Sequence, residues 1–546
     1  MPTIETLPYA DTQYFSRLFL DYIAQNPAVQ PFCRYPFSAK GIADSLADLS
    51  GQPTAYDRAL LCDVLHRQYR HTAMPQAVAD NIAALAQTQT MVVATAHQPN
   101  ICLGPLYLVY KIAAAIRLAA QLQASFPQYR LVPVYYMGSE DHDIAEINHI
   151  NVYGKTTTWQ PTQGGAVGRL PTDSLSPFFD ELGDVLGKGD AEQRVLDLLR
   201  RCYLEQATLG EATRAWVNHL FGSYGLVVLD PDDADLKRGV FSRIAQAELQ
   251  GIRTVNPTNT NAPPCRSIDY VRLTDQALHA AGYESQAHAR PVNLFYLAAG
   301  SRERIETHND EWTTADGKQH WTKAQLLDIA RHETERLSPN VILRPAYQQA
   351  ILPAAAWIGG GGELAYWLQL KGVFAAFGIH YPVLVPRNSA LWIDSNTAQK
   401  MERLSLSVRD VFRNADKLIV EYVQHNSHNE LNLFAQKQLL QTAFEQILEH
   451  ARQIDPTLQS SVVGEMTKLT KSVEALEAKL LRAEKRNFET AAAQIRAIKA
   501  KLFPANTLQE RHDNMLPYYI KHEQQFIETL INNFEPLDAR FIIFWA

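Results

Sequence analysis

Short apolar runs, rich in β-branched and aromatic residues, alternate with helical patterns through the middle of the chain. Leu131 to Tyr136 is the clearest run and predicts a buried strand, and Met91 to Thr95 predicts another. Between them, Leu106 to Gln123 carries apolar residues at helical spacing. Strand, helix and strand in this order predict a right-handed unit with parallel strands, so the loops after both strands should emerge at one edge of a sheet.

Further elements extend this α/β pattern. The same reasoning predicts strands at Gly225 to Leu229, Ser338 to Arg344 and Tyr381 to Pro386, a hairpin of Pro291 to Leu297 with Arg302 to Glu306, and a helix at Ala346 to Ala356. Two of these strands should deliver a cation to the sheet edge, Arg344 from the first and Arg387 from the second.

The two ends of the chain are predicted to be mainly helical. In residues 1–90, apolar residues recur three and four positions apart, and prolines and glycines interrupt this pattern. A four-three apolar repeat runs from Val462 to Ala483, and an apolar face at 436–452 could pair with it in an antiparallel hairpin that turns near Asp455. The repeat shifts by one position beyond Arg486, so the supercoil should be disturbed there. A final strand is expected at 539–544.

These patterns divide the chain into four expected parts. They are a helical segment at 1–90, a catalytic core at 91–390 with insertions at about 153–220 and 235–335, a coiled-coil domain at 391–510, and a C-terminal segment at 511–546 that returns to the core. A coiled-coil surface of this length seldom stays monomeric, so we expect a homodimer, with pairing inside one chain as the alternative.

Composition narrows the possible functions. The 546 residues carry a formal net charge of -7, which gives no reason to expect a nucleic-acid partner. No uncharged apolar run is long enough to cross a bilayer and the first residues do not resemble a signal peptide, so we expect no membrane contact and a cytoplasmic protein. Cysteines without a C-x-x-C pair are typical of reduced thiols: Cys33, Cys62, Cys102, Cys202 and Cys265. Cys102 is interpreted as a small buried residue, with a catalytic thiol as the alternative.

Four ionisable residues, Glu140, Asp141, His142 and Asp143, follow the clearest strand. In open α/β sheets, ligands bind at the edge where the strands end. The quartet could ligate a divalent cation, or one carboxylate could act as a base or amine anchor while His142 contacts an anion. Because alternate strand residues point to opposite faces, the four side chains should not all reach one ion. The competing interpretation is the acidic first turn of a helix capped by Ser139.

Other features could contribute to a ligand site. The loop from His97 to Pro105 opens a helix and could bind an anion through backbone N–H groups. Glycines 359–362 form either a hinge or a place where backbone approaches a ligand. Basic residues that could anchor carboxylate or phosphate, or else form surface ion pairs, are Arg344, Lys371 and Arg387. The run from Asp230 to Asp233 is interpreted as a solvated turn that caps the next helix.

Two common nucleotide motifs do not occur. No Gly-Lys-Ser or Gly-Lys-Thr follows the glycine run, so it is not a P-loop, and the chain has no G-x-G-x-x-G fingerprint to support hydride chemistry.

The motifs taken together resemble the cysteine-adding enzymes of bacillithiol biosynthesis, over nearly the whole chain. The residues that carry the resemblance are His97-Gln98-Pro99, Gly104 to Tyr107, Gly138 to Asp143, Glu146, Asn148-His149, Asn340 to Pro345, Gly359-Gly360, Glu363, Ala365 to Trp367, Gln369 to Lys371, Pro386-Arg387, Leu516 to Tyr519 and Pro536 to Asp538. The chain departs from the family pattern at Ala96-His97-Gln98, where Gly-Gln-Gln is usual, and at Gly361, where proline is usual.

The resemblance implies a fold and a reaction. The fold is α/β, with a Rossmann-like parallel-sheet core related to class I aminoacyl-tRNA synthetases, helical insertions, and an α-helical coiled-coil domain that makes a homodimer. The reaction is the last step of bacillithiol synthesis, in which a ligase joins the carboxyl group of cysteine to the glucosamine amine of glucosaminyl-malate. ATP is the expected cofactor, Mg²⁺ could accompany it, and no metal site in the protein is expected.

Residue roles follow from the resemblance. Catalysis is assigned to Glu140, Asp141, His142 and Asp143, and nucleotide binding to His97, Gln98, Asn100, Gly104 and Pro105. Substrate binding is assigned to Ser139, Asn148, Arg344, Gln348, Gly359, Gly360, Glu363, Tyr366, Trp367, Lys371 and Arg387. Two other functions stay open: a class I-like nucleotidyltransferase acting on a small phosphorylated substrate, and a non-catalytic coiled-coil scaffold.

Overall fold

A five-stranded parallel sheet forms the centre of the protein, in the spatial order β13-β12-β2-β3-β6. The computed structural model describes residues 2–52, 55–251, 266–308 and 311–546, so Cys265 lies outside the described residues. The strands are β2 (Thr90–His97), β3 (Arg130–Met137), β6 (Val227–Leu229), β12 (Ala354–Gly359) and β13 (Val383–Pro386). This is a doubly wound, Rossmann-like order with its switch point between β2 and β12, and it confirms the predicted parallel α/β core.

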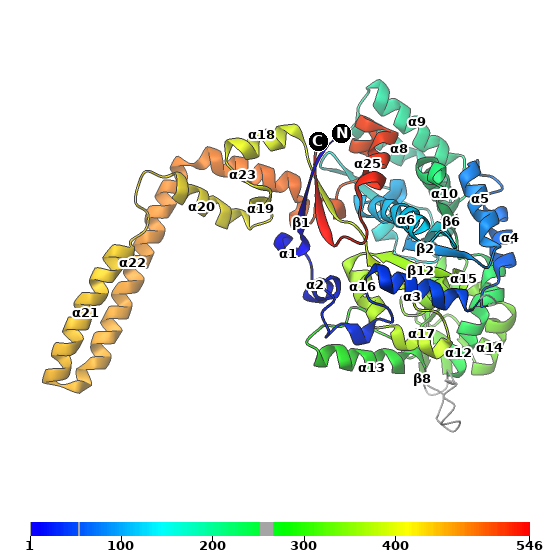
Figure 1. Ribbon diagram of the computed structural model, residues 1–546, viewed down its shortest axis with the longest axis horizontal. Coiled ribbons are helices and arrows are strands. Elements are labelled where there is room, and N and C mark those ends of the chain that lie inside the picture. Colours follow the sequence, from blue (N-terminus) through cyan, green and yellow to red (C-terminus); the bar gives the residue numbers. More distant parts are fainter. Residues whose placement is uncertain (1, 53–54, 252–265, 309–310) are drawn as a thin grey trace.

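The sheet register explains why two distant loops meet. β2 pairs with β3 in parallel from Thr90 opposite Arg130 to His97 opposite Met137, and helix α6 (Leu106–Ser125) connects them. Both strands are mainly apolar and buried over most of their length because helices cover both faces of the sheet (Figure 1). The prediction that the loops after these strands emerge at one edge is therefore confirmed.

Two predictions in this region are wrong. The run expected to be a helix through Ala356 includes the first three residues of strand β12, because helix α15 (Arg344–Ile351) stops before Pro353. Alanine favours helices when the sequence is considered alone, but this short run is buried between two strands. Arg344 does not end a core strand: strand β11 (Leu337–Pro339) lies in another sheet, and Arg344 is the first residue of α15.

A second, antiparallel sheet lies between β6 and β12 in the chain, in the order β10-β9-β8-β7-β11. Its strands are β7 (Leu294–Ala298), β8 (Ser301–His308), β9 (Glu311–Thr314), β10 (His320–Trp321) and β11. β7 and β8 form the predicted hairpin. This hairpin brings Phe295 and Arg302 to the carboxyl edge of the parallel sheet, where they line the cavity described below.

A third sheet joins the two ends of the chain. Strand β1 (Thr3–Pro8) pairs antiparallel with β15 (Arg540–Trp545), and β14 (Ala390–Ile393) pairs with β15 in parallel. The final strand is thus confirmed, whereas β1 lies in a segment that was expected to be helical. Its six residues are too short for a strong alternating pattern.

Helices make up most of the remaining chain. In the N-terminal part they are α1 (Tyr9–Thr12), α2 (Arg17–Ile23), α3 (Ala39–Ser50), α4 (Arg58–Gln68) and α5 (Gln76–Leu85). After β3 come α7 (Ile144–Ile147), the hairpin of β4 (His149–Val152) and β5 (Lys155–Thr158), α8 (Ser176–Leu186), α9 (Asp190–Leu204) and α10 (Leu209–Phe221). After β6 come α11 (Ala234–Leu236), a π-helical turn (Lys237–Phe241), α12 (Ser242–Gln250), α13 (Ser267–Ala280) and α14 (Lys323–His332). α16 (Gly361–Leu368) and α17 (Lys371–Phe377) flank the last core strand.

A long helical hairpin projects from the main body (Figure 1). It is formed by α21 (Phe434–Ile454) and α22 (Gln459–Asn487), which turn through Pro456–Leu458. The remaining helices are α18 (Ser395–Arg403), α19 (Val408–Val411), α20 (Ala415–Asn426), α23 (Glu489–Leu502), α24 (Leu516–His522) and α25 (Gln524–Asn533). The predicted hairpin near Asp455 is confirmed, and so is the disturbance beyond Arg486, where α22 ends and α23 begins. No helix in the described part of the chain is long and apolar enough to cross a membrane.

Candidate functional site

A cavity of about 780 Å³ opens at the carboxyl ends of β2, β3 and β12, beside the topological switch point. The β7–β8 hairpin and the N-terminus of α16 complete its walls. Ten of the residues assigned from the sequence line it: His97, Gln98, Glu140, Asp141, His142, Arg344, Gly360, Glu363, Tyr366 and Arg387. This position at the switch point is the usual ligand site of an open α/β sheet.

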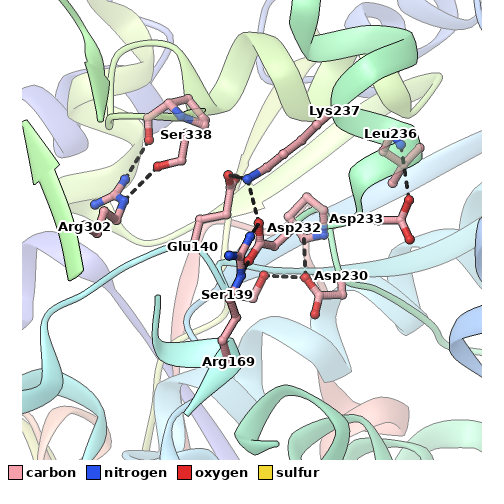
Figure 2. Close-up of polar contacts among 12 residues, drawn as sticks. Ser139, Glu140, Arg169, Asp230, Asp232, Asp233, Leu236, Lys237, Arg302 and Ser338 are labelled. Atoms are coloured by element: carbon pink, nitrogen blue, oxygen red, sulfur yellow. Dashed lines mark hydrogen bonds and ion pairs between the residues drawn. The ribbon is translucent and has the colours of Figure 1, made fainter. Parts of the chain in front are cut away.

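A buried ion-pair network holds Glu140 (Figure 2). The ammonium group of Lys237 lies 2.8 Å from Glu140 Oε1 and 2.6 Å from Asp232 Oδ1, and its side chain is fully buried. Arg169 closes the network from the solvent side, with its Nε 2.5 Å from Asp232 Oδ2. Because the chain after β3 supplies Glu140 and the segment after β6 supplies Asp232 and Lys237, the network joins neighbouring strand ends.

This environment changes the acidity of Glu140. Burial raises the pKa of Glu140 to about 7; the nearby charge of Lys237 opposes the rise and that of Asp232 adds to it. Lys237 itself would lose its proton more easily through burial, but the two carboxylates raise its pKa and keep it charged. A carboxyl group with a pKa near neutrality can accept a proton from a substrate and release it again.

Asp141 and His142 belong to a different part of the cavity wall. Gln98 Nε2 donates to Asp141 Oδ2 at 3.0 Å and to Glu146 Oε2 at 2.8 Å. Arg302 Nη1 donates to His142 Nδ1 at 2.8 Å, so Nδ1 is the acceptor and the proton of a neutral ring lies on Nε2. Burial would raise the pKa of Asp141, but the backbone N–H of His142, which donates to Asp141 Oδ1 at 2.7 Å, and the charge of Arg302 lower it, so Asp141 is a carboxylate.

The four residues of the quartet therefore do not converge on one point. Asp143 Oδ1 accepts a hydrogen bond from Glu146 N at 3.3 Å and caps the short helix α7. For Asp143 alone, the structure therefore agrees with the interpretation that the acidic run starts a helix. Ser139 does not cap this helix, because its hydroxyl donates to buried Asp230. In the described part of the chain, no group of three or more His, Cys, Asp or Glu side chains is arranged to hold a metal ion.

The prediction that Asp230 to Asp233, after β6, form a solvated turn is wrong for two of these residues. Asp233 does cap α11, but Asp230 and Asp232 are buried partners of Ser139 and Lys237. Burial raises the pKa of Asp230, and the neighbouring charge of Asp232 raises it further. Aspartate is common in turns, so sequence alone did not distinguish the two roles.

The loop after β2 contributes its first two residues to the cavity. His97 Nε2 lies 3.1 Å from the Tyr107 hydroxyl, and burial followed by the charge of Lys111 lowers the pKa of His97, so the ring is neutral. Asn100, Gly104 and Pro105 do not line the cavity. The N–H groups of Leu103, Gly104 and Leu106 already donate to Asn100 O, Ile101 O and Asp513 O. These three N–H groups are therefore not free to bind an anion.

Cys102 lies in the same loop. Its side chain is fully buried, and burial raises the pKa of its thiol. This confirms its interpretation as a small buried residue rather than a reactive thiolate.

The glycine run begins a helix that faces the cavity. Gly360 precedes α16 and its N–H donates to Glu363 Oε2 at 2.9 Å, while Gly361 and Gly362 line the cavity as the first turn. A Cβ atom on Gly359 would lie 2.2 Å from the Trp357 ring, so only glycine fits at the end of β12. Glu363 lies 2.5 Å from the buried ammonium group of Lys111, which also donates to Ala96 O.

The predicted basic anchors have different surroundings. Arg387 Nη2 lies 2.6 Å from buried Glu510, so this guanidinium is already neutralised. Arg344 donates to two neutral groups, Gln348 Oε1 at 3.1 Å and the Tyr366 hydroxyl at 2.6 Å. Lys371 lies outside the cavity, on α17, and donates to Pro31 O.

The other assigned substrate residues do not line the cavity and make contacts within the protein. Trp367 stacks on Trp357 with ring centroids 4.2 Å apart, and Asn148 donates to Trp159 O at 3.0 Å. Gln348 is buried beside Arg344, while Ser139 and Gly359 support the loops that carry Glu140 and Gly360. These residues shape the cavity without lining it.

Sequence reasoning missed several residues of the site. Lys111, Lys237 and Arg302 each pair with a site residue that is far away in the chain. No local motif marks them, because a lysine inside a helical pattern and an arginine in a hairpin are ordinary surface residues in most proteins.

The sequence matches two family models. Residues 3–388 match "Bacillithiol biosynthesis BshC, N-terminal Rossmann-like domain", and residues 390–545 match "Bacillithiol biosynthesis BshC, C-terminal coiled-coil domain". Proteins named "Putative cysteine ligase BshC" from Flavobacterium johnsoniae and Flavobacterium psychrophilum are 35% and 34% identical to the chain, over 100% of this chain and 99% of each relative. A solved structure titled as a "putative arginyl t-RNA synthetase" from Campylobacter jejuni aligns over 88% of this chain and 92% of its own, with a TM-score of 0.18 and 9% sequence identity.

Proposed function

Because this chain belongs to the BshC family of bacillithiol biosynthesis, we propose that it is a ligase that adds cysteine to glucosaminyl-malate. The carboxyl group of L-cysteine would form an amide with the glucosamine amine, as the last step of bacillithiol synthesis. The reaction is proposed to occur in the cytoplasm, and the four described cysteines are free thiols, as is usual there. The substrates are small molecules, and no nucleic acid takes part.

One observation supports this proposal above the others: the cavity combines carboxyl groups that follow a core strand with a cation that begins a helix. Glu140 and Asp141 follow β3 and suit an amine, while Arg344 begins α15 and suits a carboxylate. An amide-forming ligase must bind an amine and hold carboxylates in one site. A site of uniform charge would not serve both groups.

Glu140 is proposed to accept the proton that the amine loses. An amine attacks a carbonyl only as the free base, so a nearby group must take its proton when the carbon–nitrogen bond forms. Glu140 has a pKa near neutrality, and Lys237 fixes its position. Asp141 stays ionised and would attract the ammonium form of the substrate into the cavity.

ATP is proposed as the cosubstrate, with Mg²⁺ as its counterion. When bound, ATP would supply the group that activates the cysteine carboxyl. His97, Gln98 and the backbone of Gly361 at the start of α16 would hold it, since all three line the cavity. The neutral ring of His97 can donate or accept one hydrogen bond without adding charge.

The helical hairpin is proposed to hold two copies of the chain together. Inside one chain, half-buried Phe444 of α21 and Met466 of α22 belong to the face where the two helices pack. Leu439 and Leu476 lie on other faces and are 72% and 53% exposed. A second copy could cover these apolar side chains.

The experiment that tests the activity is reconstitution with purified protein. Cysteine, glucosaminyl-malate and ATP are incubated with the enzyme, and mass spectrometry follows the amide product. We expect the product to form, and Asp141→Ala and His142→Ala to abolish it without changing the melting temperature. Glu140→Gln should lower kcat by about 100-fold or more, because it removes the proton acceptor.

Two further measurements serve as controls for this experiment. Replacing cysteine by serine shows whether the thiol is recognised, and thiol profiling of cells with and without the gene shows whether the reaction occurs in vivo. Unchanged bacillithiol after deletion of the gene, or wild-type turnover by Asp141→Ala, would contradict the proposal.

A further inference from the structure

The cations around the cavity differ in whether a carboxylate already neutralises them. Lys111 Nζ lies 2.5 Å from Glu363 Oε2, and Arg387 Nη2 lies 2.6 Å from Glu510 Oε1. The Arg302 guanidinium donates hydrogen bonds to Ser338 Oγ, Pro339 O and His142 Nδ1. Its Nη1 lies 3.8 Å from Asp141 Oδ1. Among the described residues, no carboxylate oxygen lies within 4.0 Å of the Arg344 guanidinium.

Arg344 is nevertheless held firmly in place. Its two terminal nitrogens donate to Gln348 Oε1 and to the Tyr366 hydroxyl, at 3.1 and 2.6 Å. Both acceptors are neutral, and a guanidinium has five N–H donors, so further donors remain available toward the cavity that Arg344 lines. A partly buried cation that is fixed by neutral groups is prepared to bind an anion.

Tyr136 adds a second group to the same wall. Its side chain is fully buried yet lines the cavity, and the centre of its ring lies 5.9 Å from the Arg344 guanidinium carbon. In the part of the chain that the structure describes, its hydroxyl has no hydrogen-bond partner. A buried hydroxyl without a partner is costly, so a ligand group that accepts a hydrogen bond from it would be stabilised there.

We propose that Arg344 and Tyr136 form a subsite for a carboxylate of the acceptor substrate, and that Arg387 does not. The inference rests on the proposed function for the identity of that substrate, a sugar amine that carries a dicarboxylic acid. The guanidinium would bind the two carboxylate oxygens and the Tyr136 hydroxyl would donate to one of them. Arg387 serves instead to neutralise Glu510.

The position of Tyr136 on β3 gives the subsite a role in orientation. Tyr136 is the last residue but one of β3, and Glu140 follows it four residues later in the chain. The carboxylate subsite and the proposed proton acceptor are therefore connected through a short piece of backbone. Binding of the carboxylate would fix the position of the acceptor's amine relative to Glu140.

Binding of L-malate tests the subsite without any need for catalysis. Isothermal titration calorimetry measures malate, and malamide as its uncharged analogue, on the full-length wild-type protein and on two variants. We expect saturable binding of malate alone, weakened about tenfold by Tyr136→Phe and further by Arg344→Gln, because each removes a hydrogen bond to a charged group. Tyr129→Phe and Arg70→Gln are the matched controls, since both residues lie away from the cavity, and they should bind like wild type.

The outcomes separate this inference from the proposed function. If malate does not bind, or binds both variants as tightly as wild type, the subsite is wrong even where the wild-type enzyme forms the amide. If malate binding depends on both residues but no amide forms, the subsite stands and the ligase proposal fails. In steady-state kinetics, Tyr136→Phe should raise KM for the acceptor about tenfold and leave KM for cysteine unchanged, which a general loss of stability would not do.

Discussion

At the residue scale, the site depends on contacts that no local pattern contains. Glu140 and Asp141 could be predicted at the cavity, because they follow a strong apolar run and strand ends collect ligands. Lys237 could not, since it lies 97 positions later in the chain and its role depends on how β6 packs beside β3. The sequence therefore locates the acid groups, and the fold determines their protonation.

The charge balance around Glu140 predicts opposite effects for its two neighbours. Asp232 raises the pKa of Glu140 and Lys237 lowers it. Asp232→Asn should therefore move the acidic limb of the kcat/KM profile to lower pH, and Lys237→Met should move it to higher pH, each by about one unit. The base works when deprotonated, so activity rises with pH through this limb. Profiles measured from pH 5 to 9 check the prediction, and shifts of equal sign would contradict it.

At the element scale, strands with β-branched residues were predictable and the alanine-rich strand was not. β2 carries valine, β3 carries valine and tyrosine, and both were predicted from the sequence. β12 reads Ala-Ala-Ala-Trp-Ile-Gly, and its three alanines were assigned to a helix. Pro353, directly before it, was the available signal, because proline ends a helix. The break between α22 and α23 was predictable, because a shift of the apolar repeat is visible in sequence.

The packing of α3 against β12 includes a histidine that should make folding sensitive to acid. His380 Nε2 lies 2.9 Å from Ser45 Oγ, and Ser45 donates its own proton to Ala355 O, so His380 donates here. Burial, followed by the charge of Arg34, lowers the pKa of His380 to about 4. Above pH 6.5 the ring is neutral in the folded and unfolded states. As pH falls toward 4, the unfolded state takes up the proton first and stability is lost.

His380→Gln tests this directly. Between pH 7 and 4.5 the wild-type protein should lose about 2 to 3 kcal/mol of unfolding free energy more than the variant does, by the linkage of pKa to stability. Chemical denaturation at both pH values measures the difference. His71→Gln, at an exposed histidine, is the control and should behave as wild type. An equal loss in His380→Gln and wild type would show that this ring does not titrate as expected.

At the scale of the whole molecule, the main body holds the cavity and the helical hairpin projects from this body (Figure 1). The two faces of the hairpin explain why both sequence interpretations of the coiled coil have a basis. Pairing inside one chain does occur, between α21 and α22. It leaves three leucines of the predicted seam, Leu469, Leu476 and Leu480, at 44%, 53% and 44% exposure. The packing of α21 on α22 thus leaves part of the apolar surface of the hairpin exposed to solvent.

Replacing these three leucines by serine tests the homodimer. The intrachain contacts of Met466 and Val473, both half-buried, remain in the variant, so the hairpin should still form. We expect light scattering coupled to size exclusion to give a dimer mass for wild type and a monomer mass for the triple variant, with an unchanged helix content by circular dichroism. Burial of about 25 cal/mol per Å² of apolar surface on each copy supplies the driving force that serine removes.

The control for the dimer test is a matched surface change on the same helix. Lys471→Ser with Lys479→Ser alters exposed positions outside the apolar stripe and should leave the dimer intact. A wild-type protein that is monomeric at micromolar concentration would contradict the proposal, and so would a dimeric triple variant, because either result means that these leucines do not meet a second copy. If the triple variant is monomeric and still forms the amide at the wild-type rate, each cavity works alone. That outcome is expected, because the hairpin that carries these leucines projects from the main body, which holds the cavity (Figure 1).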